Sequence, residues 1–288
     1  YATVFDLLPL QLPENFPSGA DQNHQLWLEA ISQFNGAVCI SKAVADDFRF
    51  WQDATGFKCQ NRRPFSIDWF HLGADVTNSA PSRGLPKNAE ATLQKLKAFP
   101  SFLMVGTIEP RKGYLQTFEA FEQLWREGAE VNLVIVGHEG WKSLTEEMRR
   151  DIPQTVERLR THPELNKRLF WLEGITDEYL EKIYAASNCL IAASYGEGFG
   201  LPLIEAAQHQ LPIIARNIPV FREVAGGHAF YFDTVNPEGL ALCISEWLSL
   251  YTDGKHPQSL NITWLTWKKS AARLMQHVLE RNTVQLAL

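Results

Sequence analysis

The stretch Ser194-Tyr195-Gly196-Glu197-Gly198-Phe199-Gly200-Leu201-Pro202-Leu203-Ile204-Glu205 decides the fold of this 288-residue chain. The apolar run before it, residues 189–193, is typical of a buried strand in a parallel sheet. Pro202 suits the first turn of a helix, where its missing N–H costs nothing. A strand, a glycine-rich loop and a helix start therefore follow one another. This arrangement presents free backbone amides and a positive helix end to an anion.

Two carboxylates, Glu197 and Glu205, stand on either side of this predicted anion site, with seven residues between them. Carboxylates repel a bare phosphate but accept hydrogen bonds from hydroxyl groups. A ligand with hydroxyls on both sides of a diphosphate, which describes a nucleotide sugar, fits that pattern. The alternative is that both are ordinary solvated acids near a helix start, where acids are favoured.

The stretch resembles the Glu-(seven residues)-Glu signature of retaining GT-B glycosyltransferases of family 4, in the form Ser-x-x-Glu-Gly-Phe-Gly-Leu-Pro-x-x-Glu-Ala. The resemblance implies an α/β fold of GT-B type, with a complete C-terminal Rossmann-like domain and the second half of an N-terminal one. It implies that Glu197 contacts the donor sugar as a catalytic residue and that Glu205 accepts from the ribose hydroxyls. The donor diphosphate is then expected at Gly198, Phe199, Gly200 and Leu201.

A second motif is Val105-Gly106-Thr107-Ile108-Glu109-Pro110-Arg111-Lys112-Gly113, which follows the predicted strand 102–105. Gly106 permits a tight turn and a close ligand approach. Arg111 and Lys112 are cations where a helix begins, which is locally unfavourable unless an anion binds there. The motif resembles the Val-Gly-Thr-x-Glu-Pro-Arg-Lys variant of the family, whose basic pair contacts the donor diphosphate. Gly106 and Thr107 are therefore expected in the donor site, and a solvated surface pair is the alternative.

The resemblance implies further positions around the cleft. Ile175, after Gly174, matches the place where family members hold the nucleobase through backbone atoms. Asp6 and His71 are expected near the cleft, although each has a structural alternative, Asp6 as a cap of local amides. Many family members carry His-Asp-Leu where this chain has Phe5-Asp6-Leu7, so the N-terminal histidine that approaches the sugar is replaced.

The chain is expected to divide into four segments. They are a partial N-terminal, acceptor-side Rossmann-like domain (1–80), a linker (81–97), a C-terminal nucleotide-sugar-binding domain (98–260) and a C-terminal helix (261–288). Strands of the larger domain are predicted at 102–105, 133–136, 169–172, 189–193 and 212–215, with amphipathic helices between them. For the last helix, plain core packing and a crossing back to the N-terminal domain are both open. Its predicted apolar stripe comprises Trp264, Trp267, Ala271, Leu274 and Val278.

Composition excludes several classes of function. A formal net charge of −6 argues against broad nucleic-acid binding, and no apolar run is long enough to be a transmembrane segment. The four cysteines form no C-x-x-C pair, which fits a reducing cytoplasm. No Asp-x-Asp pair stands at a strand end, so the predicted chemistry needs no metal, and no cofactor is expected. The chain begins with Tyr1 and has the character of a piece of a longer protein.

The sequence therefore predicts a metal-independent hexosyltransferase that takes its sugar from a nucleoside-diphosphate sugar. The runs 213–226 and 137–141 resemble the mannosyl- and rhamnosyltransferase branch that builds bacterial surface polysaccharides, including lipopolysaccharide, so GDP-mannose is the first donor expected. The acceptor is expected to be a glycan or lipid-linked glycan. The protein is expected in the cytoplasm, with peripheral association at the inner face of the membrane. Alternatives are a GT-B nucleotide-sugar epimerase, a Rossmann dehydrogenase and a truncated non-catalytic binding module. A dehydrogenase would need G-x-G-x-x-G at Gly106, and this chain does not have it.

Overall fold

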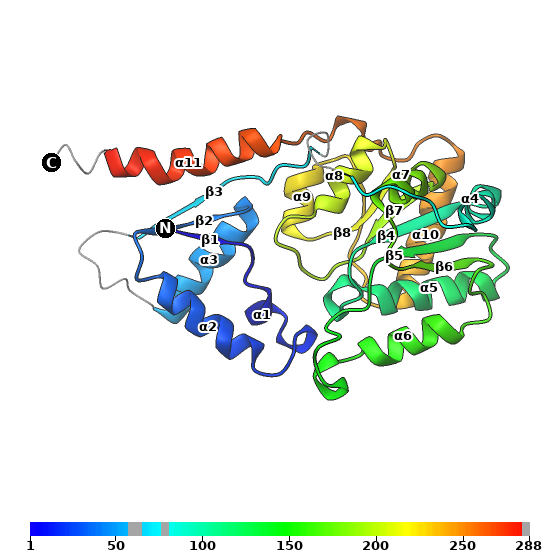
Figure 1. The fold of residues 1–288 in the computed structure, drawn as a ribbon, viewed down its shortest axis with the longest axis horizontal. Helices are drawn as coiled ribbons and strands as arrows, with labels where there is room; N and C mark the ends of the chain where they lie inside the picture. The colour runs from blue at the N-terminus through cyan, green and yellow to red at the C-terminus, as the bar shows by residue number, and fades with distance from the viewer. Residues whose placement is uncertain (57–64, 76–80, 284–288) are drawn as a thin grey trace.

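The computed structural model describes residues 1–56, 65–75 and 81–283. They form two sheets, each of parallel strands, with helices packed on them (Figure 1). The smaller, N-terminal sheet has the order β1 (Ala2–Val4), β2 (Gly36–Cys39), β3 (Ser66–Trp69). Its helices are α1 (Leu8–Gln11), the short turn η1 (Pro13–Asn15), α2 (Ala20–Ile31) and α3 (Lys42–Thr55). Parts of the expected N-terminal domain, residues 57–64 and 76–80, and the end of the expected last helix, residues 284–288, lie outside the described residues.

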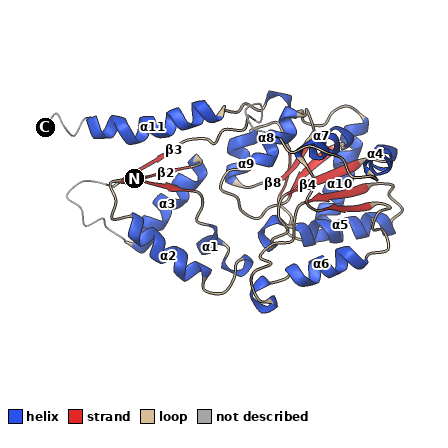
Figure 2. Ribbon diagram, in the orientation of Figure 1, coloured by secondary structure: helices blue, strands red, loops and turns tan. Residues whose placement is uncertain are grey.

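The larger, C-terminal sheet has six parallel strands in the order β6-β5-β4-β7-β8-β9 (Figure 2). They are β4 (Ser101–Val105), β5 (Asn132–Val136), β6 (Leu169–Leu172), β7 (Cys189–Ala192), β8 (Ile213–Arg216) and β9 (Phe230–Phe232). The five strands predicted here are confirmed. The edge strand β9 was not predicted, because a strand of three residues, of which only Phe232 is fully buried, carries too little pattern.

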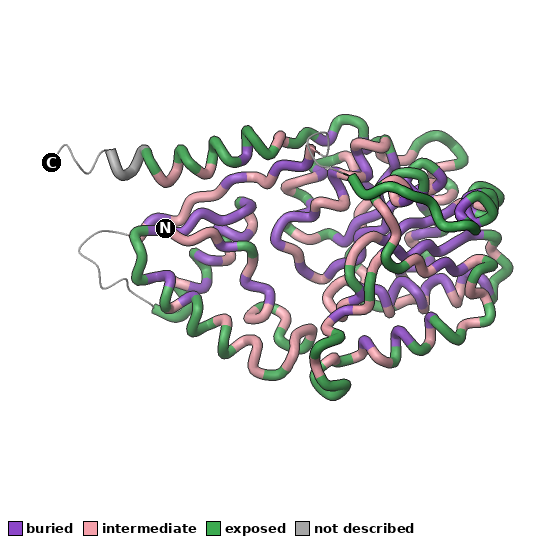
Figure 3. Tube along the Cα trace, viewed as in Figure 1, coloured by how far each residue is buried: buried purple, intermediate pink, exposed green. Residues whose placement is uncertain are grey.

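Helices cover both faces of this sheet, and its strands are largely buried (Figure 3). Side chains of β4 show why, since Phe102 and Met104 point into one core while Leu103 points into the other. The first core is closed by α5 (Tyr114–Arg126), α6 (Ile152–Thr161) and α10 (Pro237–Thr252). The second is closed by α4 (Ala89–Ala98), α7 (Asp177–Ala186), α8 (Leu201–Gln208) and α9 (Pro219–Ala225).

Helix α4 corrects the expectation of a linker over 81–97. Ala89, Leu93 and Leu96 are buried in the second core, where α4 packs beside α7. The residues before α4 have the composition of a linker, and α4 itself is short and mostly polar outside its buried residues, so the sequence did not indicate a helix here. We therefore propose that the C-terminal domain begins with α4 and that the connection is shorter than expected.

The last helix, α11 (Trp267–Thr283), lies along the N-terminal sheet (Figure 1). Leu274 and Val278 pack against residues of that sheet, and Ser270 Oγ donates to the His71 carbonyl at 2.7 Å. The predicted start at 261 is wrong, because the short turn η4 (Ser259–Asn261) and an extended segment precede the helix. The predicted stripe is wrong at Trp264 and Trp267, which are 40% and 49% exposed, and at Ala271, which is also exposed.

Candidate functional site

The two predicted donor motifs follow neighbouring strands at the point where the strand order of the C-terminal sheet reverses. β4 and β7 are paired, β5 and β6 extend from one side, and β8 and β9 extend from the other. Crevices outside the carboxyl ends of strands at such a switch point are where ligands bind in open α/β sheets. The motif after β4 includes the single turn η2 (Pro110–Lys112), and the motif after β7 leads into α8.

Glu197 lies between the two predicted cations. Its Oε2 is 3.0 Å from Arg111 Nη1, and its Oε1 is 2.5 Å from Lys112 Nζ. Ser194 Oγ donates to Oε1 at 2.8 Å, and Arg111 Nε lies 3.0 Å from Glu109 Oε2. The structure therefore brings Glu197, Arg111 and Lys112, three residues from two motifs, into one ion cluster.

The Glu197 side chain is only 12% exposed. Burial alone would raise its pKa, but the Lys112 ammonium and the Arg111 guanidinium outweigh burial and hold that pKa below the ordinary value. Burial likewise acts to lower the pKa of Arg111, and the carboxylates of Glu197 and Glu109 reverse this effect and raise it. Glu197 and Arg111 are therefore charged at neutral pH, in a partly desolvated setting where charge–charge forces are strong.

Glycines let the two loops approach each other and the neighbouring strand end. Gly106 has φ +140°, and its carbonyl accepts from Tyr114 Oη at 2.5 Å. A Cβ on Gly137 would come within 1.8 Å of that same carbonyl oxygen. Gly200 caps α8 in the left-handed conformation, with φ +100°. Thr107 is exposed, whereas Leu201, the first residue of α8, is half-buried.

Glu205 lies in α8 and lines a cavity of about 570 Å³, separate from the ion cluster. Tyr184 Oη donates to Glu205 Oε2 at 2.8 Å, and the ring of His209 stacks on Tyr184 at 4.6 Å. Burial raises the pKa of Glu205, against the opposing effects of Tyr184 and His209. Ile175 is half-buried and packs against the second core.

The N-terminal sheet closes over the Glu197 loop. Ser41 Oγ donates to the Gly198 carbonyl at 2.8 Å, and a Cβ on Gly198 would lie 2.2 Å from the Phe5 carbonyl oxygen. The His71 ring lies 5.2 Å from that of Phe199, which is buried. His71 is thus brought beside the loop that carries Glu197, residues 194–200, which we call the donor loop.

Asp6 caps a local backbone amide, which is the structural alternative considered for it. Its Oδ1 accepts from the Leu8 amide at 3.1 Å, at the start of α1. Its charge also contributes to raising the pKa of Arg111, so Asp6 lies on the side of the ion cluster.

Sequence reasoning did not assign three side chains that hold these groups. Tyr184 positions Glu205, Ser194 positions Glu197, and Glu223 bonds to His71 and to backbone amides of α3. Ser194 stands within the first motif and Glu223 within the run 213–226, whereas Tyr184 stands in neither.

Among residues 1–56, 65–75 and 81–283, no cluster of three or more His, Cys, Asp or Glu side chains could hold a metal ion. No helix there has the length and apolar character needed to cross a bilayer.

The sequence is similar to curated mannosyltransferases. It is 48% identical to the serotype-specific mannosyltransferase WbdA of Escherichia coli over 276 residues. This alignment covers 96% of this chain and 33% of WbdA. It is 30% identical over 151 residues to the O-antigen chain mannosyltransferase RfbU of Salmonella typhimurium, covering 52% of this chain and 38% of the relative. The chain thus spans about a third of the length of WbdA.

Solved structures share the architecture. Sucrose-phosphate synthase from Thermosynechococcus elongatus aligns with a TM-score of 0.69 at 19% identity, over 98% of this chain and 67% of that one. Anabaena Alr3699/HepE, in complex with UDP and glucose, aligns with a TM-score of 0.66 at 16% identity, over 96% and 70%. The expected GT-B type of α/β fold is confirmed, with a complete six-stranded sheet and a partial three-stranded one. Residues 88–261 match the model of the glycosyl transferases group 1, and the chain belongs to that family.

Proposed function

We propose that this chain is the catalytic part of a retaining mannosyltransferase that uses GDP-mannose and extends a bacterial surface glycan. The observation that carries the proposal is Glu197 held between Arg111 and Lys112 at the switch point of the C-terminal sheet. The mannosyltransferase relatives support mannose as the transferred sugar. Guanine as the base, the identity of the acceptor and retention of configuration are parts of the proposal.

The chemistry proposed for the cluster follows from its charges. The bond from the anomeric carbon to the diphosphate oxygen breaks, and a bond to the acceptor hydroxyl oxygen forms on the same face of the sugar. The acceptor proton passes to the leaving phosphate oxygen. Arg111 and Lys112 stabilise the negative charge that develops on the diphosphate, while Glu197 binds the sugar hydroxyls.

The remaining donor contacts are proposed on position alone. Glu205 accepts from the ribose hydroxyls, with Tyr184 fixing its carboxylate. The nucleobase lies at Ile175, after β6. The diphosphate contacts the backbone of the two motif loops at Gly106, Thr107, Gly198, Phe199, Gly200 and Leu201.

The setting of the reaction belongs to the same proposal. The acceptor is a glycan or lipid-linked glycan, and the protein acts in the cytoplasm at the inner face of the membrane. In this proposal His71 and Asp6, which follow strands β3 and β1, belong to the acceptor side of the cleft.

A ligand screen followed by product analysis tests this proposal. GDP-mannose and GDP are expected to raise the melting temperature more than UDP, ADP or dTDP sugars, because a ligand that binds the native state stabilises it by mass action. Mannosyl transfer or slow hydrolysis of GDP-mannose is then expected. A C2-epimerised sugar would favour the epimerase alternative, and binding without turnover would favour the non-catalytic module.

A further inference from the structure

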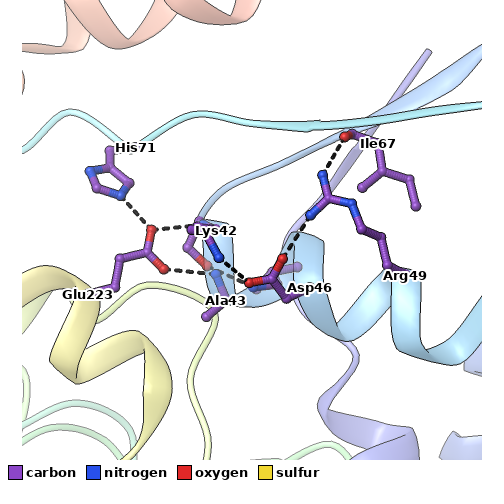
Figure 4. A network of polar contacts seen from close by, with 9 residues as sticks. Lys42, Ala43, Asp46, Arg49, Ile67, His71 and Glu223 are labelled. Atoms are coloured by element: carbon purple, nitrogen blue, oxygen red, sulfur yellow. Dashed lines mark hydrogen bonds and ion pairs between the residues drawn. The ribbon is translucent and has the colours of Figure 1, made fainter.

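Glu223 lies on α9, which packs on the C-terminal sheet. Its carboxylate bonds to two segments that adjoin the N-terminal sheet (Figure 4). Its Oε1 accepts from the Lys42 amide at 2.8 Å and lies 2.6 Å from His71 Nε2. Its Oε2 accepts from the Ala43 amide at 2.8 Å. A single carboxylate therefore joins the start of α3 and the segment after β3 to a helix about 150 to 180 residues away in sequence.

This carboxylate completes the cap of α3. The first amides of a helix have no partner within the helix. Ser41 Oγ accepts from the Val44 amide at 3.1 Å, and Glu223 takes the two amides before it. Burial would raise the pKa of Glu223, but His71 and the two amides outweigh burial and lower it. Glu223 is therefore ionised at neutral pH, at the positive end of a 14-residue helix.

The groups that Glu223 holds are the same groups that contact the donor loop. Ser41, the N-cap of α3, donates to the Gly198 carbonyl, and His71 packs against Phe199. Gly198 and Phe199 directly follow Glu197 in sequence. The position of α3 and His71 therefore sets the wall against which the Glu197 loop rests.

We propose that Glu223 is a positioning residue that fixes the N-terminal sheet against the donor loop and thereby keeps Glu197 in place for transfer. The kinetic part of this inference rests on the proposed function. Glu223 touches neither the ion cluster nor the Glu205 cavity, so its loss disturbs the closed arrangement while the nucleotide contacts of the C-terminal sheet remain.

Glu223→Gln and Glu223→Ala test this, with Asp46→Asn as a matched control. Asp46 is an exposed acid on α3, and its partners Lys42 and Arg49 lie on α3 as well. Hydrogen exchange is measured for peptides covering 41–48 and 194–200. Exchange at Lys42 and Ala43 should rise about tenfold or more in the Glu223 variants, the scale of a lost charge-assisted hydrogen bond. Exchange at 194–200 should rise with it, and Asp46→Asn should leave both unchanged.

Kinetics and binding supply the second readout. Transfer from GDP-mannose should fall about 10- to 100-fold in kcat for Glu223→Ala, the scale of a misplaced reacting group. GDP affinity should fall less than kcat, because the proposed contacts of Arg111, Lys112 and Glu205 do not depend on Glu223. Wild-type exchange at either peptide in both Glu223 variants, or undiminished kcat, overturns the inference. If wild-type protein neither binds GDP nor uses GDP-mannose, the proposed function fails, whereas the exchange of 41–48 and 194–200 still decides the role of Glu223. Glu223→Gln keeps the side-chain shape and serves as the test if the Ala variant does not fold.

Discussion

Glu197 and its neighbours form a cluster whose formal charges cancel. Arg111 and Lys112 are balanced by Glu109 and Glu197 before any donor binds. In the proposed function, a bound diphosphate would bring at least two further negative charges and compete with Glu197 for the same two cations. We therefore propose that donor binding redistributes these contacts, with Glu197 exchanging a cation for the sugar hydroxyls.

Replacing Glu197 by Gln separates its role toward the sugar from its effect on the diphosphate. Transfer or donor hydrolysis is expected to fall by at least ~10²-fold, the scale of one positioned catalytic group. GDP should bind as well as or better than to wild type, since the cations lose a competitor. Isothermal calorimetry and a turnover assay on the same preparation measure both. Wild-type turnover in this variant would remove Glu197 from the mechanism.

Glu205→Ala is expected to weaken nucleotide binding. Loss of hydrogen bonds from ribose hydroxyls to a charged acceptor costs roughly 1.5–3 kcal/mol, or about 10- to 150-fold in affinity. The raised pKa of Glu205 reflects a burial cost that the alanine variant no longer carries, so the ligand-free protein should not be destabilised through that charge. Titration with GDP measures the effect, and Tyr184→Phe should weaken binding less. Equal GDP affinity for wild type and Glu205→Ala would exclude the ribose role.

The junction between η2 and α5 sets the direction of both cations. Gly113 joins the two elements at φ +70°, and a Cβ there would lie 2.4 Å from the Ala193 carbonyl oxygen. Ala193 precedes Ser194, which holds Glu197. This contact of one glycine therefore brings the motif after β4 against the motif after β7.

Gly113→Ala should destabilise the protein by more than the ~1–2 kcal/mol of a left-handed non-glycine residue, because backbone must also shift. Gly128→Ala is the matched control, since Gly128 has φ +88° at the other end of α5 with nothing within 4 Å of the added Cβ. Urea unfolding measures both free energies of unfolding. GDP affinity should fall only in the Gly113 variant, and equal losses in both would show that the Ala193 contact does not matter.

Secondary structure followed local pattern where the pattern was strong. Ser41 is an example, because serine favours the position before a helix, and its Oγ accepts from the Val44 amide at the start of α3. Helix α4 was missed because its stripe of buried residues is narrow, and its burial depends on α7, which lies far along the chain. The start of α11 was misplaced because Trp264 and Trp267 suggested a buried face, whereas the surface that they occupy is exposed.

The two sheets contact each other on both sides of the donor loop. On one side Glu223 holds α3 and His71. On the other, Arg150 donates from Nε to the Phe16 carbonyl at 2.6 Å and from Nη2 to the Pro13 carbonyl at 3.1 Å. Both sets of polar contacts join the N-terminal segment of the chain to the domain that carries Glu197.

Activity is expected to survive chelation. The charge on the leaving diphosphate can be stabilised by Arg111 and Lys112, which take the place that a divalent ion fills in other transferases. Transfer from GDP-mannose should therefore proceed at the same rate in EDTA as in Mg²⁺ or Mn²⁺. A loss of turnover in EDTA that either ion restores would contradict this expectation.

The sequence by itself determined the parallel C-terminal sheet and the two loops that carry the predicted site. Apolar runs of strand length, glycines and a proline at a helix start are local patterns, and local sterics and burial act on them directly. The same patterns supplied the residue types of the site, namely two carboxylates and two cations. The assignment of these residues to sugar, ribose and diphosphate stays a prediction.

The tertiary structure decided which of these groups meet. Glu197 bonds to cations 85 and 86 residues away, and Glu223 to amides 180 and 181 residues away. Such pairings depend on the order of the strands, because neighbouring strand ends bring their loops together whatever their separation in sequence. No local pattern carries that order, so the partners of Glu205 and Glu223 became visible only once the sheet was assembled.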